Sequence, residues 1–439
     1  MSGRLGWLDG LRGLAALVVV FDHSSHTFMP DFRAELMPQF NTSRYGIMVF
    51  FLVSGYIIPA SLERRGCVRT FWIGRVFRVY PLWAVVVAVL LAVDVLGLAE
   101  LRDTGSQSAL TVAVAHVTML QELLGTPNVL LVLWTLSYEM CFYLLVVALF
   151  TVRLHRRSAA VAVLLAVLAG VSAAAGAVLP SSALSGLVGT GPLIAFASIA
   201  MGVALCCACS GSPVPRVFGG VLGGALGLAL VAFNGTVPLW EGLLILAVMF
   251  LGTAVRRAER GRSTWRSAGG TAVLVVVCAV GSAYRYGDGD HFTRRGWITA
   301  FLLAVLTFAA GWAWRGRRLP RPLIGLGAVS YSVYLVHPVL LAVIDGTAGR
   351  RHDDNAVLEV AFFAVLLPLC VVTHRHIEAR GQTWGRRLAR RSGDKASRDQ
   401  APRDQAPRDQ APRDQAPRVQ VSKSTVSSSD TGNDWQVRT

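Results

Sequence analysis

The stretch WLDGLRGLAALVVVFDHSSH, from Trp7 to His26, decides the fold of this chain. It opens with a charged turn and continues as an apolar helix that carries Asp22 and His23, where a membrane-spanning segment normally has no polar residue. Counted from Arg12 at about 1.5 Å per residue, His23 lies roughly 17 Å along the helix, near the middle of a hydrocarbon core about 30 Å thick. Either His23 packs between helices with its ring nitrogens hydrogen-bonded, or it faces a polar cavity and takes part in proton chemistry. Its position alone leaves both interpretations open.

The composition of the whole chain supports a membrane location for this helix. Hydrophobic residues make up 53% of the 439 residues and charged residues only 15%, a balance typical of a polytopic membrane protein rather than of two soluble domains. The formal net charge of +16 would suggest a nucleic-acid partner in a soluble protein. Here the arginines fall in short clusters between apolar runs, which indicates membrane topology and no nucleic-acid partner.

The apolar runs predict an all-α transmembrane bundle of ten to twelve spans in the lipid bilayer. Residues 107–124 form a weaker apolar helix, which we expect to lie at the outer interface, because a span there would move the arginines after residue 150 to the outside. The predicted spans cover residues 12–28, 45–61, 80–98, 129–150, 159–179, 192–209, 217–233, 239–255, 268–286, 297–314, 328–345 and 356–373.

The distribution of arginines predicts the orientation. If both termini are cytosolic, the inside loops hold many more arginines than the outside loops, as the positive-inside rule requires. We therefore expect a multi-pass protein of the plasma membrane with cytosolic N- and C-termini. The expected inside arginines are Arg64, Arg65, Arg69, Arg75, Arg78, Arg153, Arg156, Arg157, Arg216, Arg256, Arg257, Arg260, Arg262, Arg266, Arg315, Arg317, Arg318 and Arg321.

Two regions are expected along the chain, a transmembrane domain over residues 1–376 and a tail over residues 377–439. The tail is first basic and then low in complexity, with four consecutive copies of Arg-Asp-Gln-Ala-Pro from Arg398 to Pro417. Proline every fifth residue and very few apolar side chains predict a disordered cytosolic spacer. The basic stretch before the repeats is suited to contact with anionic lipid.

The N-terminal helix does not fit a cleaved secretion signal, and the cysteines do not fit a disulfide or metal-binding pattern. The helix has no small-residue cleavage site after its apolar core, so we expect it to be retained as the first span rather than removed as a secretion signal. The seven cysteines lie mostly inside apolar runs, and Cys206, Cys207 and Cys209 have no histidine or second cysteine pair at metal-ligand spacing. We expect buried free thiols, with no disulfide, no metal site and no cofactor.

Two motifs in the second and third runs are candidates for substrate contacts. Ser54-Gly55 is a small pair that lets a ligand or another backbone approach closely, although plain helix packing is the favoured explanation. In RVFRVYP, Arg75 and Arg78 share one side of a helix just before Pro81. Positive-inside anchoring explains most arginines of this chain, but this pair is also suited to bidentate binding of phosphate oxygens.

Two further ionisable residues are expected near the depth of His23. Glu139, in LWTLSYE, lies about 15 Å from the outer end of its span, where an acidic side chain costs roughly 2.5 to 3.5 kcal/mol and needs a partner. His337, in SYSVYLVHP, precedes Pro338, which we expect to break the helix and free carbonyls that line a cavity. A buried pair and a structural kink are the alternatives. Two imidazoles and a carboxylate at one level favour a general base with its orienting group.

In this order, the motifs resemble the acyltransferase-3 family, polytopic bacterial membrane enzymes that O-acylate cell-surface sugars and some antibiotics. The similarity spans roughly residues 5–376. It rests on the LDGLRG opening with Asp9, Arg12 and His23, on YGIMVFFLVSGYI, on RVFRVYP, on LWTLSYE and on SYSVYLVHP.

The resemblance implies a cytosolic acyl-CoA donor as co-substrate and a hydroxyl acceptor on a polysaccharide, another sugar or a glycosylated metabolite such as a macrolide. Arg75 and Arg78 would hold the phosphates of the coenzyme. His23 would act as general base or acyl relay, and Glu139 would orient it or balance its charge. The supporting substrate-binding candidates are Arg12, Ser54, Tyr331 and His337.

Two other hypotheses remain. A proton-coupled transporter or flippase of a glycan or small molecule would also use intramembrane His and Glu, but the chain shows no obvious internal repeat, and a phosphate-bearing donor explains Arg75 and Arg78 better. A structural anchor whose tail is the working part leaves the buried ionisable groups without a role.

Overall fold

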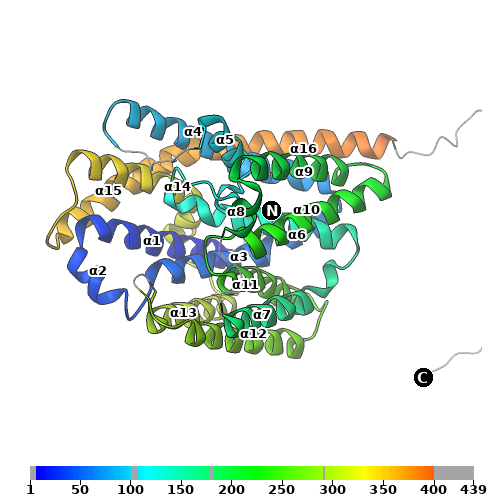
Figure 1. Cartoon of the computed structure of the whole chain (residues 1–439), viewed down its shortest axis with the longest axis horizontal. Helices are drawn as coiled ribbons and strands as arrows, with labels where there is room; N and C mark the ends of the chain where they lie inside the picture. Colours follow the sequence, from blue (N-terminus) through cyan, green and yellow to red (C-terminus); the bar gives the residue numbers. More distant parts are fainter. Residues whose placement is uncertain (1–5, 100–106, 177–181, 290–291, 400–439) are drawn as a thin grey trace, which may run out of the picture. The chain divides into compact units, whose positions relative to one another are not determined.

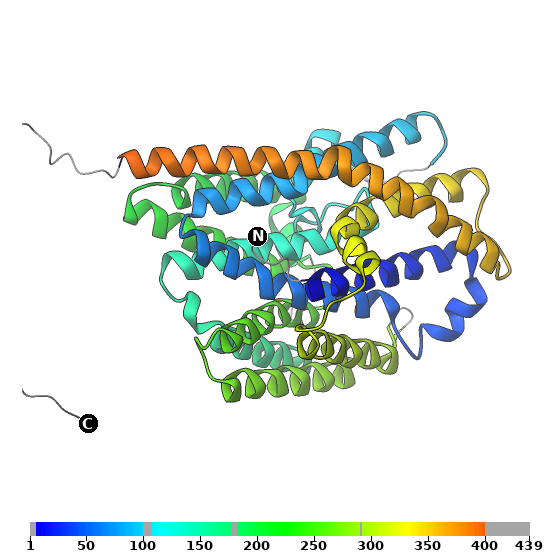
Figure 2. The same cartoon turned by 180° about the vertical axis from the view of Figure 1, so that it is seen from behind.

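The structure, a computed structural model, describes residues 6–99, 107–176, 182–289 and 292–399, with side chains described as far as residue 391. Every regular element in these ranges is a helix, which confirms the predicted all-α class. The chain divides into two compact units, Met1–Gly393 and Asp394–Thr439. The first unit contains the helical bundle shown in Figures 1 and 2.

Eleven helices among the described residues are long and apolar enough to cross a membrane, within the predicted range of ten to twelve. The first long helix, α1 (Gly6–Phe28), packs beside them and carries Asp9, Arg12 and Asp22. The other long helices are α3 (Thr42–Arg65), α4 (Val68–Val95), α6 (Trp134–Thr151), α7 (Ser158–Ala175), α9 (Thr190–Ala208), α10 (Pro213–Asn234), α11 (Leu239–Glu259), α12 (Trp265–Tyr286), α13 (Arg294–Ala313), α14 (Arg321–Thr347) and α15 (Ala356–Thr373).

The short elements connect these helices. The predicted interfacial helix is α5 (Ala109–Val117), whose 9 residues are too few to cross a bilayer. The remaining short elements are α2 (Pro30–Leu36), α8 (Ala183–Val188), the 3₁₀ turns η1 (Gln121–Leu124), η2 (Leu131–Leu133) and η3 (His155–Arg157), and the π-helical turn η4 (His374–Glu378).

The basic stretch after residue 376 differs from the expected disordered tail at its start. The last span continues through η4 into α16 (Ala379–Asp399), so the basic stretch begins as a helix and not as a disordered segment. The cause is packing, because a Cβ at Gly381 would lie 2.9 Å from the Pro81 ring and one at Gly385 would lie 2.5 Å from Phe77. The Arg-Asp-Gln-Ala-Pro repeats from residue 400 onward lie outside the described residues.

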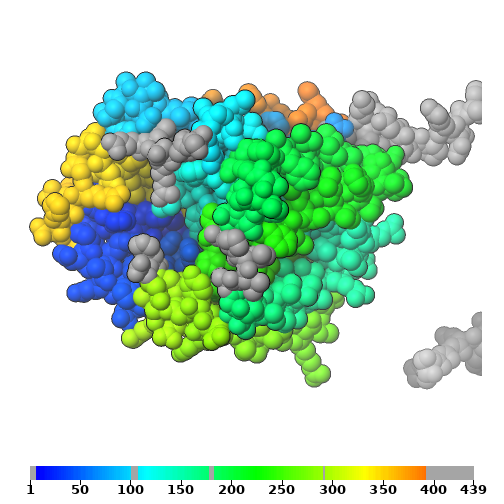
Figure 3. All heavy atoms as spheres, in the orientation of Figure 1, coloured from blue at the N-terminus to red at the C-terminus, as the bar shows by residue number. Residues whose placement is uncertain are grey.

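The helices α1 and α14 run side by side in the same direction, although their contacts join residues as far apart in sequence as Thr27 and Asp345, a separation of 318. At one end Gly13 packs against Gly327 and its neighbour, and a Cβ at Gly327 would lie 1.9 Å from the Asp9 carbonyl oxygen. At the other end Thr27 donates to the Asp345 carboxylate over 2.8 Å. In Figure 3 the first helices (blue) and the segment around α15 (yellow) are neighbours on the surface. The packing of α1 against α14 brings residues 23 and 337 to the same level.

A second close crossing joins α3 to α11. A Cβ at Gly55 would lie 1.8 Å from the Met249 carbonyl oxygen, and one at Gly252 would lie 2.3 Å from the Leu52 carbonyl oxygen. Thr253 donates across the same contact to the Gly55 carbonyl over 2.8 Å. Helix packing, the favoured explanation for the Ser54-Gly55 pair, is therefore confirmed for Gly55.

Burial separates inner helices from outer ones. In their most apolar windows α3, α6 and α11 are 78, 78 and 83% buried inside the protein, whereas α4 is only 22% buried and α7, α12 and α13 are 33% buried. The outer helices expose apolar side chains such as Val89, Leu168 and Leu306, as expected of surfaces that face lipid. The inner helices enclose the polar groups described below.

The loops that follow α3, α6, α9, α11 and α13 return to the face at which α1 begins, which we call the arginine face. Ion pairs connect these loops: Arg262 Nη1 lies 2.8 Å from Glu63 Oε2, and Arg315 Nε lies 3.0 Å from Glu259 Oε1. The arginine face carries Arg64, Arg65, Arg69, Arg153, Arg156, Arg157, Arg216, Arg260, Arg262, Arg315, Arg317 and Arg318.

We predict that Gly55→Ala lowers the stability of the purified protein, because the added methyl group meets the Met249 backbone and the two helices must separate. Overpacking of this kind costs about 1 to 3 kcal/mol. The measurement is the thermal unfolding midpoint in detergent. Gly202→Ala is the matched control, since a Cβ there meets nothing within 4 Å. Equal midpoints for the two variants would contradict the assigned crossing.

Candidate active site

Two cavities lie end to end along the same five helices, α1, α3, α4, α6 and α14. The large cavity measures about 1620 Å³ and the small cavity about 80 Å³. Each helix contributes to both: α14 lines the small cavity with Ser330, Tyr331 and Tyr334, and the large cavity with the segment from Pro338 to Gly346. Since α14 starts at the arginine face, the small cavity is the nearer of the two to that face.

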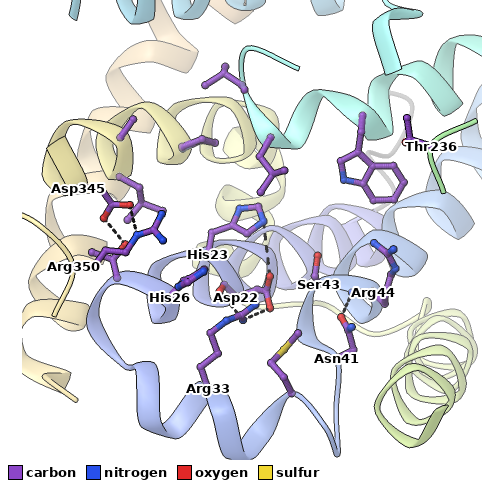
Figure 4. Close-up of a pocket in the computed structure, with 18 of the residues that line it drawn as sticks. Asp22, His23, His26, Arg33, Asn41, Ser43, Arg44, Thr236, Asp345 and Arg350 are labelled. Carbon is purple, nitrogen blue, oxygen red and sulfur yellow. Dashed lines mark hydrogen bonds and ion pairs between the residues drawn. The ribbon is translucent and has the colours of Figure 1, made fainter. Parts of the chain in front are cut away.

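Asp22 and His23 lie together in the wall of the large cavity (Figure 4). Asp22 is held by Arg33 of α2, whose Nη1 is 2.8 Å from Asp22 Oδ1, and by the Thr42 hydroxyl at 2.6 Å. His23 Nε2 is 3.8 Å from Asp22 Oδ2. That distance exceeds a hydrogen bond, but it is short enough for the carboxylate to stabilise a positive charge on the imidazole.

His23 also contacts His337 of α14, with 2.9 Å between His23 Nδ1 and His337 Nε2. His337 Nδ1 is 2.8 Å from the Val333 carbonyl oxygen, which can only accept. His337 Nδ1 therefore carries the proton, His337 Nε2 accepts, and His23 Nδ1 donates to it. The hydrogen bonds leave His23 Nε2 as the nitrogen with a free lone pair, at the wall of the large cavity.

The small cavity combines two arginines with one carboxylate. Arg12, Arg78 and Glu139 line it, and the Tyr143 hydroxyl donates to Glu139 Oε1 over 2.6 Å. The charges that act most strongly on Arg12 are those of Arg78, Asp9, Glu378 and Glu139. Each carboxylate offsets part of the cost of placing an arginine among apolar helices.

Arg75 lies beside this cavity rather than in its wall. Its guanidinium stacks over the Tyr143 ring, 5.3 Å from the centroid, and Nη2 donates to the Ser61 hydroxyl over 3.2 Å. The structure therefore separates the two predicted phosphate ligands, with Arg78 in the cavity and Arg75 between it and the arginine face.

The expected pairing of Glu139 with His23 is wrong. Among the described residues, Glu139 bonds to Tyr143 and shares the small cavity with Arg12, while His23 contacts Asp22 and His337 in the large one. The position of Glu139 along α6 determines its depth in the bundle, but it does not determine which neighbouring helix the side chain faces. The orienting groups of His23 come from its own helix and from α14.

The two cavities are separated by side chains of α14 and α6. The Tyr334 hydroxyl donates to the Val132 carbonyl over 3.0 Å and lies 2.6 Å from the Thr135 hydroxyl. The His337 ring follows one turn later, 6.2 Å from the Tyr334 ring and fully buried. The break expected at Pro338 is absent, because α14 is continuous from Arg321 to Thr347.

The weaker candidates fall into two groups. Ser54 and Tyr331 both line the small cavity, although the Tyr331 hydroxyl is already used in a 2.9 Å bond to the Val79 carbonyl. His337 is not among the described residues that line either cavity. Both of its ring nitrogens are occupied, so its position suits the orientation of His23 rather than contact with a substrate.

Sequence reasoning missed a buried ion pair in the large cavity. Arg44 binds Glu241 in two places, with Nε 2.7 Å from Oε1 and Nη2 3.2 Å from Oε2, and stacks 5.1 Å over the Trp134 ring. Trp297 Nε1 also donates to Glu241 Oε1 over 3.1 Å. The available signal is an acidic residue near the start of the predicted span 239–255, a position that does not distinguish a buried ion pair from an interfacial charge.

A second missed carboxylate is Glu378, on the π-helical turn η4. It is buried and accepts from the Ser332 hydroxyl over 3.0 Å and from Gln382 Nε2 over 3.0 Å. It also acts electrostatically on Arg12. Among the residues in the described ranges, no group of three or more His, Cys, Asp or Glu side chains is arranged to hold a metal ion.

Comparison with known proteins identifies the family. The sequence pattern of the acyltransferase-3 family, described as an acyltransferase domain, matches residues 5–375. The chain therefore belongs to this family, and the resemblance inferred from its motifs is confirmed. It is also 32% identical over 148 residues to a protein named acyltransferase MdmB from Streptomyces mycarofaciens, a match that covers 32% of this chain and 38% of the relative. No solved structure matches.

We predict that Arg44→Gln destabilises the protein more than Glu241→Gln does. The Glu241 side chain is 2% exposed and would be left charged without its partner, whereas Arg44 is 24% exposed and keeps some access to water. Loss of one partner of a buried pair costs about 3 to 5 kcal/mol.

The double variant Arg44→Gln/Glu241→Gln is the control for this prediction. Because it leaves no unpaired charge, its unfolding midpoint should recover part of the loss caused by Arg44→Gln alone. Strictly additive losses would show that the two side chains do not form an energetically coupled pair.

Proposed function

We propose that the protein is a membrane-bound O-acyltransferase that moves an acyl group, acetyl in the simplest case, from cytosolic acyl-CoA to a hydroxyl of a carbohydrate or glycosylated metabolite. Membership of the acyltransferase-3 family supports the reaction class. The observation that carries the proposal is the end-to-end placement of two cavities, with the His23–His337 contact beside the partition between them.

The donor side of the proposal rests on charge. Acyl-CoA is a polyanion of the cytosol, and the positive-inside rule assigns the arginine face to the cytosol, with both termini there and the plasma membrane as the location. Arg75 lies between that face and the small cavity, and Arg78 and Arg12 line the cavity. In this proposal the three arginines follow one another from the arginine face into the small cavity. They bind the phosphates of the coenzyme and guide its arm inward.

The acceptor side rests on the lone pair of His23. His23 Nε2 takes the proton of an acceptor hydroxyl in the large cavity, and the hydroxyl oxygen attacks the thioester carbonyl carbon. A C–O bond forms, the C–S bond breaks, and the departing coenzyme sulfur takes the proton back from His23. Asp22 stabilises the imidazolium between these two steps. The products are an ester and free coenzyme A.

We predict that His23→Ala reduces acyl transfer by about a hundredfold or more, because removal of a general base costs at least this much. The assay uses membranes that contain the protein, labelled acetyl-CoA and a panel of hydroxyl acceptors. Undiminished transfer in His23→Ala would reject the catalytic assignment. Movement of an acceptor across the membrane without acylation would favour the transporter hypothesis.

Arg78→Ala should raise the KM for acyl-CoA by about tenfold, with a smaller effect on kcat, because the guanidinium is assigned to donor binding. Arg260→Ala is the control, since this arginine is exposed on the same face but lines neither cavity. An equal rise in KM for both variants would indicate a general effect of surface charge instead of a donor site.

The assigned tautomer gives a separate prediction for His337. His337→Leu removes the acceptor that holds His23 Nδ1–H, whereas the amide oxygen of His337→Gln can replace Nε2 at that position. We expect a loss in kcat of about tenfold to a hundredfold for the leucine variant, partial recovery for the glutamine variant, and an unchanged KM for the acceptor. Equal losses in both variants, accompanied by lower thermal stability, would assign His337 a structural role only.

A further inference from the structure

The charged residues in the wall of the large cavity are arranged in matched pairs. Each of its three described carboxylates bonds to an arginine that also lines the cavity. The pairs are Arg33 Nη1 with Asp22 Oδ1 at 2.8 Å, Arg44 Nε with Glu241 Oε1 at 2.7 Å, and Arg350 Nε with Asp345 Oδ2 at 2.9 Å. Figure 4 shows the first and last of these pairs on two sides of the cavity.

Further bonds hold these pairs in place and reduce their freedom to bind a charged ligand. Asp22 also accepts from the Thr42 hydroxyl, Asp345 from the Thr27 hydroxyl over 2.8 Å, and Glu241 from the Trp297 indole. Arg44 uses two nitrogens of its guanidinium, Nε and Nη2, on one carboxylate. The formal charges of these Asp, Glu and Arg residues cancel, so the described wall offers no uncompensated Asp, Glu or Arg charge.

The rest of the wall is wide and combines apolar side chains with polar ones such as His26, Asn41, Ser43 and His352. Three rings, those of Trp134, Tyr286 and Phe292, line the cavity together with Leu131 and Pro238. At about 1620 Å³ it exceeds the roughly 300 to 1,000 Å³ of an ordinary small-molecule site. A single monosaccharide would leave most of this volume to water, whereas a molecule of several rings would fill it and contact the apolar surfaces.

A charged acceptor would enter this cavity at a cost. Its ionic group would lose water and meet Asp, Glu and Arg side chains whose charges are already neutralised, so these side chains could stabilise it only if an existing pair were broken. A neutral hydroxyl-bearing molecule pays no such penalty and still gains from the apolar wall. Selection against charge then follows from the wall itself, without a dedicated contact.

We propose that the large cavity binds an uncharged acceptor of several linked or fused rings, one hydroxyl of which reaches His23. This inference rests on the proposed acyl transfer and specifies its acceptor class. Two sources share this chemistry, a neutral oligosaccharide and a glycosylated multi-ring metabolite. Acceptors that carry a carboxylate or phosphate inside the cavity are excluded from the class.

The first experiment identifies the charge of the natural product. Membranes that contain the protein receive labelled acetyl-CoA and an extract of the organism that makes it, and labelled products are separated by ion exchange and by size. We expect a product that passes both cation and anion exchangers and is larger than a disaccharide. Sugar analysis and mass then distinguish the two sources.

A labelled product that is retained on either exchanger, or that is a monosaccharide, overturns the inference while leaving acyl transfer intact. Absence of any labelled product counts against the proposed function itself, and the inference falls with it.

The second experiment changes the wall. Asp345→Asn leaves Arg350 without its carboxylate, and Glu241→Gln does the same for Arg44. The probes are a neutral trisaccharide and the same trisaccharide ending in a uronic acid, each tested as an inhibitor of transfer to the acceptor found above. We expect the uronic-acid probe to gain about threefold to tenfold relative to the neutral one in either variant, as expected for one unpaired charge in a partly screened site.

The control is Asp288→Asn, which breaks an ion pair of the same kind, with Arg294 at 2.9 Å, outside the described cavity wall. It should leave the ratio of the two probes unchanged. Two cavity variants are used because Glu241→Gln can fail to fold. Asp345→Asn is expected to fold, since its ion pair lies nearer the surface, with the Arg350 side chain 56% exposed. An unchanged ratio in every variant that folds, or an equal change in Asp288→Asn, would overturn the inference.

Discussion

The interior of this protein is governed by the cost of placing ionised groups among apolar helices. A carboxylate or guanidinium in that setting is tolerated only when another group compensates it. Asp22 is compensated by Arg33, Glu241 by Arg44, and Glu139 lies with Arg12 and Arg78 around the small cavity. These partners come from different helices, so the requirement for compensation also fixes how α1, α2, α3, α6 and α11 are placed around the two cavities.

The same requirement separates two chemical environments along one axis. The cavity nearer the arginine face contains two arginines and one carboxylate, and the larger cavity contains a histidine with a free lone pair and charges that cancel. Tyr334 and His337 stand between them. A polyanionic donor and a neutral acceptor are therefore suited to opposite ends, which is the arrangement that the proposed transfer needs.

The fold was largely predictable because apolar runs of span length leave few alternatives to a helical bundle. Each predicted run corresponds to a helix, and the segment expected at the interface contains the short helix α5. The site was predictable only in part. His23 and His337 met as their depths suggested, but Glu139 did not join them, because depth along a span does not determine which neighbouring helix a side chain faces.

The partners that the sequence did not indicate share one property: they arise from contacts between distant segments. Arg44 and Glu241 are 197 residues apart, and Ser332 and Glu378 are 46 apart. A polar residue near the end of a predicted span has no feature that distinguishes anchoring at the interface from a buried ion pair. Helix pairing decides between the two, and it depends on close approaches such as Gly327 against Asp9.

The π-helical turn His374–Glu378 interrupts an otherwise continuous helix from Ala356 to Asp399. A turn of this kind holds one residue more than an α-helical turn, and one residue corresponds to a rotation of about 100° around the axis. The rotation lets α15 present one register to the bundle while α16 presents another, in which Gly381 and Gly385 fit against α4 and Glu378 points inward. The π-helical turn thus sets which face of α16 meets α4. Removal of one residue from it would rotate α16 away from this contact, whichever residue is removed.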